Sequence, residues 1–204
     1  MYRKNYRCVV EGQQERMYLN RLAELVRDFP KTVVSFNISE GNAYDLTKIY
    51  IEYDSVCLFD YDYNQVEFEE NLAICDKLYQ KNKPGKRKEG KYVYHAYSNV
   101  CFDLWLLLHK KNFTKLVSKN DGYVDEIIKA YHLPKGSNIK NEKIIGIILN
   151  QISLDDVKMA IKRAKAIKTQ NSVKKAHYVN SLIYYDNPDL SIHEFISKVL
   201  DDIK

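Results

Sequence analysis

Residues 55–62 read Ser-Val-Cys-Leu-Phe-Asp-Tyr-Asp, an apolar run that leads directly into two acids. The run is short, apolar and partly β-branched or aromatic, which predicts a buried strand over residues 55–59. Asp60 and Asp62 follow at the carboxyl end of this strand, separated by one residue. If strand geometry persists through them, both side chains point to the same side. The stretch therefore predicts a strand that ends in a pair of carboxylates.

Short strands and helices alternate on both sides of this stretch. Further strands are predicted over residues 6–10, 32–38 and 92–97, where apolar and β-branched residues form short runs. Helices are predicted where apolar residues recur at helical spacing, over residues 13–29, 43–53, 65–80 and 100–112. This order predicts an α/β core with about four mainly parallel strands and helices on both faces of the sheet.

The second half of the chain is more polar, and its pattern is helical. Helices are predicted over residues 121–131, 154–168 and 191–203. We therefore expect an α/β core over residues 1–112 and a helical extension over residues 113–204. The extension is expected to pack on the core, so that the 204 residues form one compact domain.

Composition narrows the class of protein. No apolar run approaches the roughly 20 residues that a membrane-spanning helix requires, and the N-terminus lacks the apolar segment of a secretory signal. The four cysteines are scattered, without a Cys-x-x-Cys pair or a Cys/His cluster. These features predict a cytoplasmic protein that does not bind membranes and has reduced thiols and no structural zinc.

A second acidic motif follows the first predicted strand. Glu11 comes directly after that strand, and Glu15 lies one helical turn later. The carboxyl ends of parallel strands hold the working groups of such sheets, so Glu11 is expected near Asp60 and Asp62. Carboxylate oxygens suit Mg²⁺ or Mn²⁺. Each motif alone is common in ordinary loops and helix caps, but their combination predicts a site for one or two divalent ions.

Asp103 lies in a predicted helix that is apolar nearly all round. A carboxylate buried there must be paired, protonated or bound to metal. The alternative is an acid in the first helical turn, stabilised by the free amides of the helix start. His109, six residues further on, does not share a helix face with Asp103 and is interpreted as a core residue.

Charge is unevenly distributed along the chain, whose net charge is +5. Residues 52–70 contain acids but no bases, and residues 158–175 contain bases but no acids. An acidic centre with basic surfaces is typical of a metal site that acts on a polyanion. In the helix predicted at 154–168 a basic stripe opposes an apolar face. The stripe predicts a surface that binds the phosphate backbone of nucleic acid, through the candidate residues Lys158, Lys162, Arg163 and Lys165. The alternative interpretation is that the stripe is an ordinary solvated helix face.

Three stretches of the chain resemble the RloB/AbiLii family. They are residues 9–19 (Val-Val-Glu-Gly-Gln-Gln-Glu-Arg-Met-Tyr-Leu), 58–62 (Leu-Phe-Asp-Tyr-Asp) and 98–109 (Ser-Asn-Val-Cys-Phe-Asp-Leu-Trp-Leu-Leu-Leu-His). Residues 185–191 also resemble the ending of the family, so the match spans nearly the whole chain. The family is associated with bacterial phage defence and abortive infection. Its members look like compact versions of the Toprim fold, which implies a Toprim-like, Rossmannoid core here.

The resemblance also implies roles for individual acids. Glu11 matches a strand-one glutamate credited with metal binding or acid/base catalysis. Asp60 and Asp62 match a metal-binding pair, and Glu15 matches a second acid of the family. Asp103 stands where the family usually has the longer Glu, which puts its reach to a metal in doubt.

Lys135 loosely resembles the lysine of a Tyr-x-Lys element in the family, although the spacing here departs from that element. It is a candidate for contacting phosphate. Val100 stands where the family pattern has Pro, a departure that matters less.

The resemblance implies a Mg²⁺- or Mn²⁺-dependent Toprim nuclease that hydrolyses the phosphodiester bonds of DNA or RNA in anti-phage defence or abortive infection. It also implies a companion ATPase. The alternative is a non-catalytic effector or regulatory subunit of an ATPase-containing defence complex. A primase or topoisomerase fits less well, because no DNA-breaking tyrosine domain is evident. The choice among DNA, messenger RNA and transfer RNA stays open, as does homo-oligomer formation.

Overall fold

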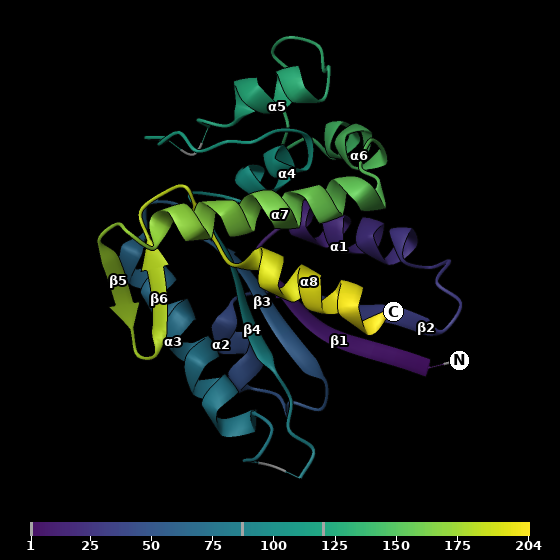
Figure 1. Cartoon of the computed structure of the whole chain (residues 1–204), viewed down its shortest axis with the longest axis vertical. Helices are drawn as coiled ribbons and strands as arrows, with labels where there is room; N and C mark the ends of the chain where they lie inside the picture. The colour runs from purple at the N-terminus through teal and green to yellow at the C-terminus, as the bar shows by residue number, and fades with distance from the viewer. Residues whose placement is uncertain (1, 87, 120) are drawn as a thin grey trace.

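A five-stranded sheet in the order β2-β1-β3-β4-β7 forms the centre of the computed structural model, which describes residues 2–86, 88–119 and 121–204 (Figure 1). The first four strands run parallel, and β7 is antiparallel to β4. The predicted mainly parallel α/β sheet is confirmed, with an additional fifth strand. The strands are β1 (Tyr2–Val10), β2 (Thr32–Glu40), β3 (Asp54–Asp60), β4 (Val93–Asn99) and β7 (Asp189–Leu190).

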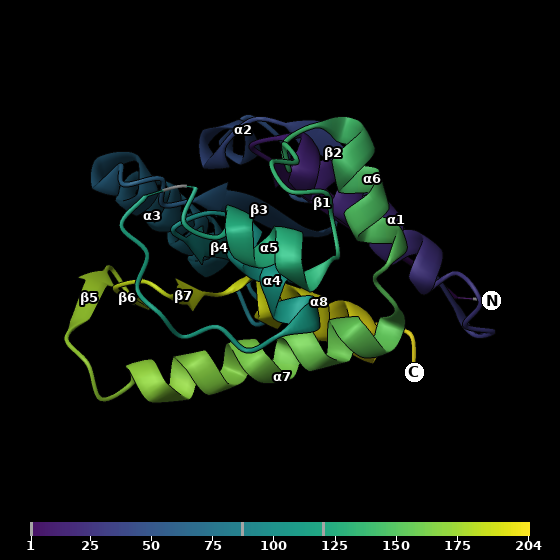
Figure 2. The same ribbon diagram turned by 90° about the horizontal axis from the view of Figure 1, so that it is seen from above.

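Helices cover both faces of the sheet, and the alternation of side chains along each strand explains why. On β1, Cys8 and Val10 belong to one hydrophobic core, and Val9, between them, belongs to the other. Figure 2 shows α2 and α3 on one side of the sheet and α7 and α8 on the other. The larger core lies under α1 (Gln13–Leu25), α4 (Asp103–Lys110), α7 (Leu154–Asn171) and α8 (Ile192–Asp202), and the smaller one under α2 (Ala43–Thr47) and α3 (Gln65–Asn82).

The second half of the chain is not purely helical, which corrects the prediction. It contains α5 (Val124–Ala130), α6 (Glu142–Asn150), α7 and α8, but also a hairpin of β5 (Ala176–Val179) and β6 (Leu182–Tyr185) and the strand β7. These strands have two to four residues. Such lengths are too short for the alternation that identifies a strand in a sequence.

Four predicted helices are shorter than expected. Those predicted over 13–29 and 121–131 are α1 and α5, which each lack four of the predicted residues. The helix predicted over 43–53 ends as α2 at Thr47, and beyond it Ile51 is buried while Tyr50 is exposed. The helix predicted over 100–112 begins only at Asp103. There the backbone N–H of Phe102 donates to Asp60 Oδ2 at 3.0 Å. The start of α4 is therefore tied to the end of β3.

Among the described residues, no helix is both long enough and apolar enough to cross a membrane.

Candidate functional site

Acidic side chains gather where the parallel strands end. β1 ends one residue before Glu11, and β3 ends at Asp60. The Glu11 carboxylate accepts a hydrogen bond from the backbone N–H of Asp60 at 3.0 Å. The Asp60 carboxylate in turn accepts from Phe102 N–H at the start of α4. Backbone hydrogen bonds thus bring three distant parts of the chain to one place.

Asp62 reaches the same place by a turn rather than by an extended strand. Its φ is +42°, so the strand geometry on which the same-side prediction depended stops at Asp60. The turn is held by Asp62 N–H, which donates to the carbonyl of Val100 at 3.0 Å, and by Tyr61 N–H, which donates to the carbonyls of Ser98 and Val100 at 3.1 Å. The loop after β3 therefore lies against the loop after β4.

Five carboxyl groups form what we call the acid cluster: those of Glu11, Glu15, Asp60, Asp62 and Asp103. Burial and repulsion among these groups raise their pKa values. Burial, with the charges of Glu15, Asp62 and Glu67, raises the pKa of Glu11 to about 7, although the Asp60 N–H lowers it. Burial and the charge of Glu15 hold the pKa of Asp60 well above its usual range. The pKa of Glu15 is raised by burial, with contributions from Asp103 and Asp62. Ionised together, these groups destabilise one another.

Asp103 is fully buried in the first turn of α4, and burial raises the pKa of its carboxyl group. Its Oδ1 accepts a hydrogen bond from Gln14 Nε2 at 3.2 Å and lies 3.5 Å from Lys140 Nζ. Its Oδ2 has no hydrogen-bond partner within the part of the chain that the structure describes. Asp103 is thus both a helix-start acid and a paired buried acid, and one of its oxygens remains available.

Lys140 lies near the cluster and, like Gln14, was not among the candidates that the sequence indicated. Its ammonium group donates to Gln14 Oε1 at 2.7 Å. Burial lowers the pKa of Lys140, but the charges of Asp103, Asp60 and Glu15 outweigh this effect and raise it overall. Lys140 lies in a polar loop before α6 without periodicity or motif, so no sequence signal pointed to it.

Lys135 lies elsewhere. It lines a separate cavity with Asp125, Lys129 and His132 on and after α5, and the structure does not bring it to the acid cluster. Its role as a phosphate contact stays a prediction.

The basic stripe on α7 divides into two kinds of residue. The predicted inward face is buried, and Lys158, Lys162 and Lys165 are exposed. Arg163 is half-buried and donates to the carbonyl oxygens of Leu108 at 2.6 Å and His109 at 2.9 Å. Those carbonyls lie at the carboxyl end of α4, so Arg163 caps that helix. Nucleic-acid binding by this surface stays a prediction.

The acid cluster has suitable chemistry for a divalent cation but not a finished coordination shell. Among the described residues, no three His, Cys, Asp or Glu side chains are arranged so that they could hold a metal ion. The donor set nevertheless fits a hard cation, because it consists of crowded carboxylates with raised pKa values and includes the unpaired Asp103 Oδ2. These side chains would have to move for coordination.

The fold and the site define an α/β protein with an acid cluster at the carboxyl edge of a mostly parallel sheet. The chain belongs to the RloB-like family, because the family model for an RloB-like protein matches residues 6–199. The family resemblance of the three sequence stretches is thereby confirmed. No curated protein and no solved structure matches the chain.

Proposed function

We propose that this protein is a Toprim-like nuclease that uses Mg²⁺ or Mn²⁺ to hydrolyse phosphodiester bonds of DNA or RNA in the bacterial cytoplasm during defence against phage. The observation that carries the proposal is the acid cluster, in which five carboxylates from three parts of the chain crowd together. Such crowding is unfavourable for a protein unless a cation or protons offset it. Membership of the RloB-like family supports the role in defence.

Individual residues would divide the work as follows. Asp60 and Asp62 would hold the ion, Glu11 would be either a further ligand or the base for the attacking water, and Glu15 or Asp103 would complete a second site. Bound Mg²⁺ or Mn²⁺ would lower the pKa of a coordinated water and neutralise charge on the leaving oxygen. In the second of these roles, Glu11 would accept a proton from the attacking water, since its pKa of about 7 suits a general base near neutral pH.

Lys140 is better placed than Lys135 to contact the scissile phosphate. Its ammonium group already lies 3.5 Å from the Asp103 carboxylate, and the charges of the cluster raise its pKa. The exposed lysines of α7, Lys158, Lys162 and Lys165, would bind the nucleic-acid backbone without reading sequence. A companion ATPase would control the activity, as the family resemblance implies.

The test begins with calorimetric titration of Mn²⁺ and Mg²⁺ into the wild type and Asp60→Asn. The Asn side chain has the same shape and can still accept the Phe102 hydrogen bond, so the fold is retained. We expect binding to weaken at least about ten-fold, because one charged ligand is lost. Asp201→Asn, which removes an exposed acid on α8, is the matched control and is expected to bind normally.

Cleavage of DNA and RNA by the same three proteins then follows. Activity is expected in the wild type and Asp201→Asn and not in Asp60→Asn. Full metal binding and full cleavage by folded Asp60→Asn would show that the ligands are wrongly assigned.

A second candidate is a non-catalytic effector or regulatory subunit of an ATPase-containing complex. The position of Lys140 favours it, because its ammonium group supplies a counter-charge to the acids without any metal. In this case the folded wild type would bind neither Mn²⁺ nor Mg²⁺, whether nucleic acid is present or absent. Lys140→Met would weaken association of the protein with the companion ATPase.

A further inference from the structure

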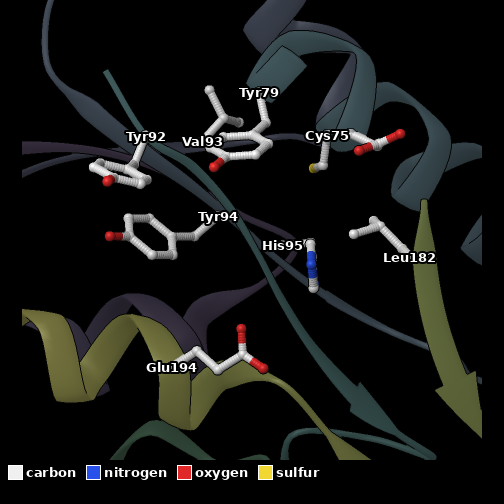
Figure 3. Close-up of a pocket in the computed structure, with 9 residues that line it drawn as sticks. Cys75, Tyr79, Tyr92, Val93, Tyr94, His95, Leu182 and Glu194 are labelled. Carbon is white, nitrogen blue, oxygen red and sulfur yellow. The ribbon is translucent and has the colours of Figure 1, made fainter. Parts of the chain in front are cut away.

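A cavity of about 220 Å³ lies away from the acid cluster, at the open edge of β4. β7 pairs only with Ser98 and Asn99, so the amino-terminal part of β4 has no neighbouring strand on that side. The cavity occupies this edge between α3, the β5–β6 hairpin and α8 (Figure 3). His95 is three residues before Ser98, which is level with Asp60. At the rise of a strand, His95 is about 10 Å from the end that carries the acids.

Tyrosine rings form one wall of this cavity. Tyr79 stacks on Tyr92 with centroids 6.0 Å apart, and Tyr92 stacks on Tyr94 at 5.8 Å. Figure 3 shows the three rings grouped on one side, with His95 on the other. Faces of aromatic rings carry partial negative charge and attract cations.

The His95 ring presents a hydrogen-bond acceptor to the cavity. The Ser191 hydroxyl donates its single proton to the His95 carbonyl oxygen and accepts from Tyr97 N–H at 3.1 Å. Toward His95 Nδ1, which lies 3.2 Å away, Ser191 Oγ can therefore only accept, so Nδ1 carries the proton. Burial lowers the pKa of His95 to about 4, which keeps the ring neutral. Nε2 is then a bare acceptor, without a hydrogen bond to any described residue.

Carboxylates supply the negative charge. Figure 3 shows the Glu194 side chain reaching from α8 toward the space between Tyr94 and His95. Its carboxylate makes no hydrogen bond or ion pair with the residues that the structure describes. Asp76, also in the wall, is already bonded to Ser181 and Gln80. Among the described lining residues there is no Lys or Arg.

Two ordinary explanations of these groups do not account for the cavity. Glu194 lies in the first turn of α8, where an acid is favourable, but that position does not require tyrosine faces and a bare histidine nitrogen beside it. Burial raises the pKa of Glu194, and the charge of Lys168 only partly offsets this; Lys168 adds to the effect of burial in lowering the pKa of His95. Lys168 does not line the cavity. Its ammonium group is paired with the buried Asp189 at 3.3 Å.

We propose that this cavity binds a guanidinium group, which stacks on the tyrosine faces and donates hydrogen bonds to the Glu194 carboxylate and to His95 Nε2. A guanidinium group is planar, cationic and only a donor, so it matches a wall of aromatic faces and a set of acceptors. The cavity is smaller than the roughly 300 Å³ at which pockets for drug-sized ligands begin, which suits a single side chain or a small cation. This proposal does not depend on nuclease activity.

The experiment is a calorimetric titration of the full chain with N-acetyl-arginine amide, with N-acetyl-citrulline amide and with N-acetyl-lysine amide. Citrulline has nearly the shape of arginine without its charge. The arginine compound is expected to bind at least about ten-fold more tightly than the other two, because charge-assisted hydrogen bonds and stacking are both available to it alone. Equal binding of all three, or no binding of the arginine compound, would overturn the proposal.

Variants then locate the binding. Glu194→Gln keeps the shape of the side chain and is expected to remove the preference for arginine over citrulline. Tyr92→Leu, at a partly exposed position, is expected to weaken arginine binding while the fold is retained. Asp201→Asn, on the same helix but outside the cavity, is expected to bind as the wild type does. Unchanged arginine binding in both cavity variants would show that the site lies elsewhere and would overturn the proposal.

The source of the guanidinium group is distinguished with agmatine. Agmatine binding more tightly than capped arginine would support a free small cation as the natural ligand. Tighter binding of capped arginine, which has peptide groups on both sides, would support an arginine side chain of a partner protein.

Discussion

The carboxylate of Glu11 is held 3.0 Å from the backbone nitrogen of Asp60, so the end of β1 is fixed against the end of β3. This bond places two acids side by side although their charges repel each other. The backbone geometry of neighbouring parallel strands, and not an attraction between the two carboxylates, therefore determines the relative position of Glu11 and Asp60. Several measurable properties depend on this arrangement.

Mn²⁺ binding is expected to strengthen as the pH rises through about 7. The pKa of Glu11 is raised to about 7, so below this pH a proton occupies the carboxylate and competes with the metal. Glu11→Gln should weaken binding and remove this part of the pH dependence. Titrations at about pH 6, 7 and 8 measure the effect, with Glu52→Gln, an exposed acid, as control. An affinity that does not change with pH would contradict the assignment of Glu11 as a ligand.

Lys140→Met is expected to destabilise the metal-free protein by about 1 kcal/mol, because the buried Asp103 loses the cation that lies 3.5 Å from it. The partial exposure of Lys140 keeps the loss small. Urea unfolding measures the change in the free energy of unfolding. Lys143→Met, an exposed position on α6, is the matched control. If both variants have wild-type stability, Lys140 does not balance the charge of the cluster.

Arg163→Met is expected to lower the free energy of unfolding by about 1–2 kcal/mol, since two carbonyls at the end of α4 lose a charged donor. Lys162→Met, one residue away and exposed, should stay within about 0.5 kcal/mol of the wild type. Lys162→Met should instead reduce the salt dependence of nucleic-acid binding by about one unit of slope. Urea unfolding and binding titrations at several salt concentrations separate the two effects. If Lys162→Met lowered the free energy of unfolding and Arg163→Met did not, these separate roles of the two residues would be refuted.

His109 is expected to make the protein sensitive to acid. Burial lowers its pKa to about 4, well below its ordinary value of 6.5. The unfolded chain therefore takes up a proton in this range and the folded protein does not, so the stabilising contribution is present above pH 6.5 and is lost as the pH falls toward 4. Over that window the loss amounts to about 3 kcal/mol.

His109→Gln should flatten the decline in the free energy of unfolding across this window. Unfolding by urea at a series of pH values measures it. His132→Asn serves as control, because His132 is exposed and has a positive φ that Asn tolerates. Equal pH profiles for the wild type and His109→Gln would contradict the prediction.

The order of elements and the position of the first acids could be predicted because both depend on local pattern. An apolar run that ends in an acid marks the end of a buried strand, and parallel strands place such ends together. Glu11 and Asp60 are therefore neighbours in the structure, as the sequence indicated. Asp62 also lies near them, but by a turn with positive φ that no strand pattern encodes.

The contribution of Lys140 could not be predicted, because it depends on tertiary packing. Its loop is anchored by the buried Ile139, whose carbonyl accepts a hydrogen bond from Gln14 at 3.2 Å. The sequence also places Arg163 in the basic stripe, because its contacts with α4 likewise depend on tertiary packing. Charge spacing on a helix does not reveal that one member faces the unsatisfied carbonyls of another helix.

The late position of β7 and α8 in the chain has a consequence for synthesis. β7 borders β4, and α8 covers the face of the sheet that β1 helps to form, yet both elements are synthesised after the other four strands of the sheet. Until then the nascent chain carries a strand with a free edge and an uncovered apolar face, which are features that promote aggregation. The sheet and its cover are therefore completed only after residues 189–202 have been synthesised, and a chain that stops near residue 186 becomes a substrate for chaperones and proteases.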